Sequence, residues 1–340
     1  MTRAAIIAAR GDPFANMLIA DSFKKVWRDE VDMLYVAVSS WLDGKVKAFL
    51  KDVVFNDPKI KLFFFDGLSQ GGDHEPFLVE QGKEDNLVML EDDVVIFKKG
   101  SIDDAFKKIE TGKYDLLGQV SGAIDPFVLE KVRNIYSTET LGPAFRFFKR
   151  KDWEKTDKVY TSFSLLPGKY YKEIRSDVPS VATMDTGLWN SVQMISLKLK
   201  VLDIKEYRAT EITPGCPWTH VNALTSWSNH RFFNPETMDF VGKMVDPKAK
   251  SIEFFRAEAR SSGSIYGKNT ASTKEWSEKE ICRLMSWVTI AMRKYWDSLA
   301  PIDEYRQAYK KGYDFFIKES EAPSLLLEKY VKENGAYLTW

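Results

Sequence analysis

Cysteine and histidine are scarce in this sequence, and their scarcity narrows the chemistry open to it. The two cysteines, Cys216 and Cys282, are too few for a disulfide framework or a thiolate zinc site. A reducing compartment is the simplest setting for such a chain, so we expect a cytoplasmic protein. Only three histidines are present, His74, His220 and His230, which leaves few candidates for an imidazole ligand.

The sequence also lacks an excess of charge of either sign and any long hydrophobic run. Lys+Arg and Asp+Glu number 49 each, and the zero net charge disfavours a nucleic-acid binder that relies on bulk basic charge. The apolar run 4–9 stops at Arg10, too early for the hydrophobic part of a signal peptide. Because no apolar run is long enough to cross a bilayer, we expect no transmembrane segment.

What the sequence has is length and apolar content, since 44% of its 340 residues are hydrophobic. That is enough for one large domain or for a domain with a helical appendage. In the first 120 residues, short apolar runs alternate with segments of helical periodicity. This βαβαβ order predicts an α/β fold with a mainly parallel, Rossmann-like sheet flanked by helices. The expected strands cover residues 4–9, 33–39, 59–65, 86–97 and 114–120, and the helices between them cover residues 14–27, 44–54 and 102–110.

The pattern changes twice along the rest of the chain. Residues 122–215 are less regular, and the charged stretch 147–158 within them is expected to be exposed. Beyond Pro247 the apolar residues recur at helical spacing. We therefore predict a domain over residues 1–245 and a helical C-terminal region over residues 246–340 that packs on it.

The most informative residues should follow the strands, because ligands of parallel sheets bind beyond the carboxyl ends of the strands. The expected strand 86–97 carries three adjacent acids, Glu91, Asp92 and Asp93, with apolar residues on both sides. Neighbouring carboxylates repel one another and are costly to bury without a partner. A divalent cation offsets both effects, and hard oxygen ligands suit Mg²⁺ or Mn²⁺. An acidic turn between two strands is the alternative interpretation.

An apolar strand that runs into such a triplet, after an N-terminal βαβαβ unit, resembles the GT-A class of nucleotide-sugar glycosyltransferases, which carry a D/E-x-D motif. The sequence Leu-Glu-Asp-Asp at 90–93 is close to the LEDD found in several families of that class, and the resemblance covers about residues 4–225. It implies a GT-A-like fold with a donor-binding half over about 1–120 and an acceptor half over about 121–245.

The resemblance also implies an activity. The enzyme would move a hexosyl or pentosyl group from a nucleoside diphosphate sugar to an acceptor hydroxyl, with Mn²⁺ or Mg²⁺ as cofactor. By analogy with the class, Asp93 would bind the metal ion. Glu91 and Asp92 would contact the ribose of the donor or the metal shell.

Two later residues fit the same class. Asp185 lies where inverting members keep the general base that deprotonates the acceptor hydroxyl, although an Asx-turn or a helix N-cap is the alternative. In a retaining enzyme, Asp185 would instead orient or stabilise the sugar. His220 has the chain position of a late histidine metal ligand, with His230 as the competing candidate and a structural role as the alternative.

The donor is expected against the loops that follow the first strands. Ala9, Arg10 and Asp12 offer backbone groups, a cation and a helix N-terminus to its phosphates. Asp12 stands before Pro13 and is the expected N-cap of the helix that follows. Ser39 stands after the second strand, where the class usually has a carboxylate, so the identity of the nucleotide stays open. His74 precedes the triplet strand, where the class contacts base and sugar, and a plain turn is the alternative there.

The acceptor is expected to be a glycan or another hydroxyl compound. A local basic face in the C-terminal part would also suit transfer to a modified base of DNA, although a solvated charged surface is the simpler account. Two other functions compete. A sugar-phosphate nucleotidyltransferase should carry a G-x-G-x-R loop after the first strand, which residues 9–12 lack. A non-catalytic module that binds glycans or nucleic acids has no need of three clustered acids.

Overall fold

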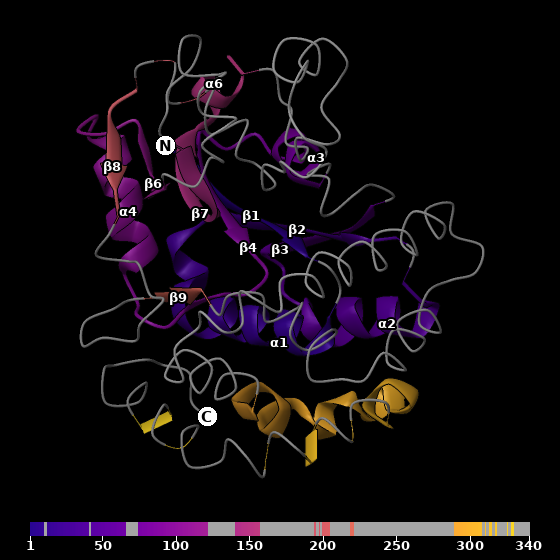
Figure 1. Ribbon diagram of the computed structural model, residues 1–340. Coiled ribbons are helices and arrows are strands. Elements are labelled where there is room, and N and C mark those ends of the chain that lie inside the picture. Colours follow the sequence, from indigo (N-terminus) through magenta and orange to yellow (C-terminus); the bar gives the residue numbers. More distant parts are fainter. Residues whose placement is uncertain are drawn as a thin grey trace, which may run out of the picture.

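The computed structural model describes most of the N-terminal half of the chain and parts of the remainder. In these parts the chain forms a mainly parallel seven-stranded sheet with helices on both faces, so the predicted α/β fold class is confirmed (Figure 1). The described residues are 1–9, 12–40, 42–65, 74–121, 140–156, 194, 197, 199–204, 218–220, 289–307, 310, 313, 314, 317, 325, 328 and 329.

The main sheet has the strand order β3-β2-β1-β4-β7-β6-β8, and β7 is the only described strand that runs antiparallel to both of its neighbours. A second, two-stranded sheet pairs β5 with β9. The strands are β1 (Arg3–Ala9), β2 (Met33–Ser39), β3 (Ile60–Phe65), β4 (Asn86–Glu91), β5 (Val94–Ile96), β6 (Leu116–Ser121), β7 (Thr140–Lys149), β8 (Val201–Asp203) and β9 (Trp218–His220).

The helices fill the connections that the sequence predicted. Two of the expected helices end in a wider turn of π-helix, which continues α1 and α2. The helices are α1 (Pro13–Ser22, then Phe23–Trp27 as π-helix and Arg28–Glu30 as 3₁₀-helix), α2 (Gly44–Phe49, then Leu50–Val54 as π-helix), α3 (His74–Gln81), α4 (Ser101–Glu110), α6 (Arg150–Trp153) and the 3₁₀-helix Asp297–Ile302. In the described part of the chain, no helix combines the length and the apolar character needed to cross a membrane.

Strand β1 shows why its sequence is continuously apolar. Ala5 and Ile7 belong to the large core beneath the sheet, whereas Ala4 and Ile6 point to the other face and join a smaller core with α3 and α6. A strand covered on both faces has no polar side, unlike the alternating strands of half-exposed sheets. The buried side chains of Ile6 and Ile7 each contribute about 1.5–3 kcal/mol to folding.

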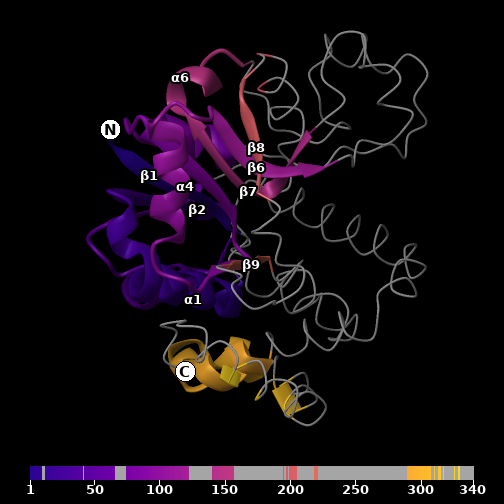
Figure 2. The same cartoon turned by 90° about the vertical axis from the view of Figure 1, so that its left-hand side faces the viewer.

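The large core extends into the C-terminal part of the chain. The segment 289–307, which we call the C-terminal segment, lies against α1 on the side away from the sheet, as both views show (Figures 1 and 2). Its side chains Ile290, Leu299 and Ile302 are buried in the same core as the first strands. Residues 289–295 and 303–307 of the C-terminal segment are helical, and the 3₁₀-helix Asp297–Ile302 lies between them. The boundary predicted near residue 245 falls outside the described residues and stays a prediction.

Two expectations about strands need correction. The acidic triplet does not interrupt one strand over 86–97, because β4 and β5 belong to different sheets. The stretch 147–158 is not exposed at its start, since Phe147 and Phe148 are buried in β7 and Trp153 is buried in α6. The charged residues around them misled the prediction, because β7 lies between β4 and β6 and buries its aromatic rings on both faces.

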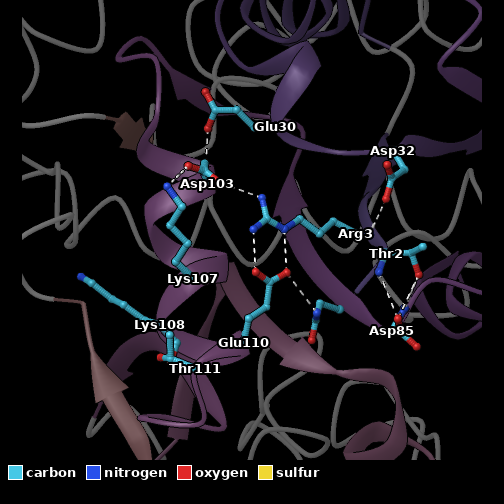
Figure 3. Close-up of polar contacts among 11 residues, drawn as sticks. Thr2, Arg3, Glu30, Asp32, Asp85, Asp103, Lys107, Lys108, Glu110 and Thr111 are labelled. Carbon is cyan, nitrogen blue, oxygen red and sulfur yellow. Dashed lines mark hydrogen bonds and ion pairs between the residues drawn. The ribbon is translucent and has the colours of Figure 1, made fainter.

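Ion pairs connect the elements at the end of the sheet where the central strands β1 and β4 begin (Figure 3). The Arg3 guanidinium donates from Nε and Nη2 to the two carboxylate oxygens of Glu110 at 2.7 and 2.6 Å, and from Nη1 to Asp103 Oδ1 at 2.7 Å. These bonds raise the pKa of Arg3, and the bond from Arg3 lowers the pKa of Glu110. Arg3 is thus paired with both Asp103 and Glu110, and these ion pairs stabilise the contact between the start of β1 and α4.

Candidate active site

The acidic triplet lies where the chain leaves the main sheet. Glu91 is the last residue of β4 and pairs in register with Ala8 of β1. Asp92 and Asp93 form the turn into β5, and they are only 7% and 5% exposed. The three acids therefore stand at the carboxyl end of the parallel strands, where the sequence predicted them.

The second sheet brings the late histidine to the same place. In the antiparallel pairing of β5 with β9, Val94 is opposite His220 and Ile96 is opposite Trp218. The Cα atoms of such opposed residues lie about 4.5–5.5 Å apart. The backbone of His220 thus lies across from the residue that follows Asp93. Asp93 and His220, the two predicted metal ligands, are neighbours in the fold.

Packing on both sides fixes this short strand pair. The backbone N–H of Ile96 donates to Ser22 Oγ at 3.0 Å, which ties β5 to the end of α1. The Trp218 ring is 1% exposed and lies 4.5 Å, centroid to centroid, from the Phe145 ring of β7. Strand β9 is thereby anchored to the main sheet next to β4. This anchoring positions the backbone of His220 against the triplet.

The loop after β1 is held at Asp12, which caps α1 as the sequence predicted. Its Oδ1 accepts a hydrogen bond from the backbone N–H of Ala15 at 2.9 Å, and Pro13 takes the first helical position. Its Oδ2 accepts a hydrogen bond from the Tyr305 hydroxyl at 3.1 Å. Asp12 is 4% exposed, so its carboxylate is engaged inside the protein. The predicted contact of Asp12 with a donor stays a prediction.

The other predicted donor contacts are distributed along the same edge. Ala9 ends β1 and is buried, so a ligand there would meet its backbone groups, and Ser39 ends the neighbouring strand β2. His74 begins α3 on the opposite face of the sheet from α1, and its buried ring lies 5.2 Å from the Phe65 ring. The predicted role of His74 in donor binding stays a prediction. Arg10, Asp185 and the competing His230 lie outside the described residues.

The chemistry of the triplet region fits a hard divalent cation. Asp92 and Asp93 offer carboxylate oxygens in a buried setting, and the register brings the backbone of His220 beside them. Among the described side chains, no group of three or more His, Cys, Asp and Glu lies close enough to hold a metal ion. The side chain of His220 is not among the described side chains.

Sequence reasoning missed two residues at this edge. Arg146 of β7 is opposite Met89 of β4, is 2% exposed, and donates from Nη2 to the Met89 sulfur at 2.6 Å. Through its pairing with Met89, Arg146 places a buried cation beside the residue that comes two positions before Glu91. Arg146 lies in the part of the chain that the sequence predicts to be less regular. Tyr305 reaches Asp12 from the other end of the chain. Nothing distinguishes Tyr305 from the other tyrosines in the sequence.

No protein-family model matches this sequence, and no curated protein matches it. Several solved structures are similar over most of the chain. One is S. aureus TarS 1-349 in complex with UDP-GlcNAc, at 12% identity over 92% of each chain and a TM-score of 0.41. Another is the galactosyltransferase LgtC in complex with donor and acceptor sugar analogs, at 11% identity over 76% of this chain and 95% of that one, with a TM-score of 0.44.

A third similar structure is the mannosyltransferase PcManGT from Pyrobaculum calidifontis in complex with GDP-Man and Mn²⁺. Its identity is 10% over 99% of this chain and 87% of that one, with a TM-score of 0.43. All three TM-scores lie below 0.5. The fold class therefore rests on the strand order and register of this chain, and the function proposed next rests on its own residues.

Proposed function

We propose that this protein is a metal-dependent glycosyltransferase of the GT-A class that moves a sugar from a nucleoside diphosphate sugar to an acceptor hydroxyl. The observation that carries the proposal is the position of Glu91, Asp92 and Asp93 at the carboxyl end of β4, with the backbone of His220 beside Asp93. The alternative of an ordinary acidic turn is weaker, because Asp92 and Asp93 are buried between two sheets. A hairpin turn in solvent would leave them exposed.

Each residue has a role in this proposal. Asp93 and His220 would hold Mn²⁺ or Mg²⁺, with Glu91 and Asp92 supporting the ribose or the metal shell. When bound, the cation would neutralise charge on the leaving diphosphate. Asp185 would take the proton from the acceptor hydroxyl in an inverting reaction. The acceptor would be a glycan or another hydroxyl compound, and the protein would work in the cytoplasm.

The donor would lie along the ends of β1 and β2. Ala9 offers backbone groups there, and the N-terminus of α1 points the positive end of its dipole toward the same edge. Arg10 would face the phosphates, between the two fixed residues Ala9 and Asp12. This placement puts the diphosphate between the first loop and the triplet, which the register of Ala8 with Glu91 brings together.

The test is a screen of nucleoside diphosphate sugars, each with Mn²⁺, for thermal stabilisation and for hydrolysis of the donor. We expect at least one donor to stabilise the protein only when Mn²⁺ is present. In Asp93→Asn, which keeps the shape of the side chain, donor hydrolysis should fall on the order of 100-fold, because a metal contact supplies several kcal/mol of charge stabilisation. The control is Asp104→Asn on the exposed surface of α4, which should behave as the wild type.

The outcomes separate the competing functions. No response to any donor in the wild type would contradict the proposal, as would Mn²⁺-dependent donor binding that survives Asp93→Asn unchanged. Turnover of a sugar phosphate with a nucleoside triphosphate, but not of a nucleoside diphosphate sugar, would favour the nucleotidyltransferase. Glycan binding without hydrolysis of any donor would favour the non-catalytic module.

A further inference from the structure

We infer that Tyr305 is a positioning residue for the donor site, because the C-terminal segment fixes the first loop through the hydrogen bond from the Tyr305 hydroxyl to Asp12. The inference rests on the proposed function, since it concerns the loop at which a donor diphosphate would bind. It assigns a task to the C-terminal segment beyond covering the core.

The contacts of Asp12 show how the loop is held. The backbone oxygen of Asp12 accepts from the backbone N–H of Asn16 at 3.0 Å and from its Nδ2 at 2.7 Å. One carboxylate oxygen accepts from Ala15, which keeps the end of α1 closed, and the other accepts from Tyr305. Tyr305 reaches Asp12 from outside α1. Its hydrogen bond therefore joins the capped end of the helix to the C-terminal segment.

Asp12 stands close in the chain to the predicted donor contact at Arg10. Only two residues separate Ala9, fixed in β1 by its pairing with Val38, from Asp12. A shift of Asp12 would therefore act on the donor contact proposed at this place. Small displacements of groups that hold a diphosphate are costly, because the bonds from backbone and guanidinium donors depend on direction.

The C-terminal segment is itself anchored at a second point on α1. The Tyr295 hydroxyl donates to Asp21 Oδ2 at 2.8 Å, and the Lys294 ammonium lies 2.6 Å from the same oxygen. Asp21 lies near the far end of α1, nine residues after Asp12 and about 13 Å away along the helix axis. Two tyrosines of one segment thus bind two aspartates of one helix, one at the donor edge and one remote from it.

This symmetry supplies a matched pair of variants, Tyr305→Phe and Tyr295→Phe. Each removes one hydroxyl from a buried tyrosine that donates to an aspartate of α1. A merely structural role predicts that both lower the melting temperature and leave ligand binding alone. A positioning role predicts that Tyr305→Phe alone weakens binding of a nucleoside diphosphate.

The experiment measures the dissociation constants of UDP and GDP, each with Mn²⁺, by calorimetry on the full chain. We expect Tyr305→Phe to raise the constant of the better ligand about tenfold, the effect of one charge-assisted hydrogen bond, and Tyr295→Phe to change it by less than about twofold. In donor hydrolysis, Tyr305→Phe should raise KM for the sugar donor and leave kcat near that of the wild type. If Tyr305→Phe and Tyr295→Phe have the same dissociation constant, whether or not it differs from that of the wild type, the inference is overturned.

A second measurement separates this inference from the proposed function. Hydrogen exchange of the peptide that spans residues 10–17, without ligand, should be faster in Tyr305→Phe than in the wild type and in Tyr295→Phe. If the wild type binds neither UDP nor GDP and responds to no donor of the screen, the proposed function is contradicted, and the exchange rates still decide whether Tyr305 fixes the loop. If the wild type binds one of them and Tyr305→Phe exchanges like the wild type, the inference fails and the proposed function stands.

Discussion

At the residue scale, the charged side chains are arranged differently at the two ends of the central strands of the main sheet. Where β1 begins, the Arg3 guanidinium meets Glu110 with two parallel bonds, and the partly buried pair is satisfied (Figure 3). Where β4 ends, three carboxylates follow one another and two of them are buried. The first arrangement lowers the free energy of the fold, whereas the second brings like charges together. Concentrating like charge in this way is what a cation site requires.

The ion pair of Arg3 predicts a pH-dependent contribution to stability. Replacing it in Arg3→Met should lower the free energy of unfolding by about 2 kcal/mol at pH 7. The bond from Arg3 lowers the pKa of Glu110. The stability that the Arg3–Glu110 ion pair contributes is therefore fully present above the ordinary glutamate pKa of about 4.3. It is lost as the pH falls through the lowered pKa of Glu110.

Urea unfolding at pH 7 and pH 3 checks this prediction. The difference between wild type and Arg3→Met should be smaller at pH 3, and a difference that grows on acidification would contradict it. The control is Lys107→Met, whose exposed side chain pairs with Asp103 at the same edge. Its unfolding should match that of the wild type at both pH values.

Single residues also show what could be predicted from the sequence. The triplet was found because three acids break an apolar run, and the Asp12 cap because aspartate before proline is a strong helix-start signal. Arg146 and Tyr305 were not found. Their importance comes from residues far away in the chain, Met89 and Asp12, and a local pattern carries no information on such contacts.

At the element scale, the short strand β9 matters more than its length suggests, because it places the backbone of His220 opposite Val94, the residue that follows Asp93. Its anchor is the Trp218 ring against Phe145. The sequence indicated neither β9 nor β7, since a three-residue strand has no measurable period and β7 carries aromatic residues beside lysine and arginine. Strands β1, β2 and β4 were predicted well, because burial on both faces leaves uninterrupted apolar runs. The short parallel strand β8 was not predicted.

The anchor of β9 can be tested by substitution. Trp218→Phe should lower the free energy of unfolding by about 1–2 kcal/mol and should also weaken Mn²⁺ binding in the presence of UDP. The matched control is Trp153→Phe, a tryptophan equally buried in α6 within the other core. It should cost similar stability and leave Mn²⁺ affinity unchanged. Equal Mn²⁺ affinities in the two variants would contradict a role of β9 in the metal site.

At the scale of the whole molecule, the chain closes on itself. The first helix is covered by the C-terminal segment, and residues almost three hundred positions apart bind each other at its N-terminus, as in Tyr305 with Asp12. Periodicity predicted that the C-terminal part is helical and amphipathic. It could not indicate which surface those helices cover, because an apolar stripe fits any apolar partner.

This closure predicts that the N-terminal sheet and the C-terminal segment unfold together. Leu299 of the segment and Ile7 of β1 are both fully buried in the same core, so Leu299→Ala and Ile7→Ala should each cost about 2–5 kcal/mol. Scanning calorimetry should show both variants lowering the temperature of one shared transition. Leu325→Ala, at a leucine that is 50% exposed, should leave that transition in place. A separate, earlier transition in Leu299→Ala alone would mean that the segment unfolds independently. In that case Tyr305 could not hold Asp12 at temperatures where the sheet is still folded, and donor binding would be lost before the fold.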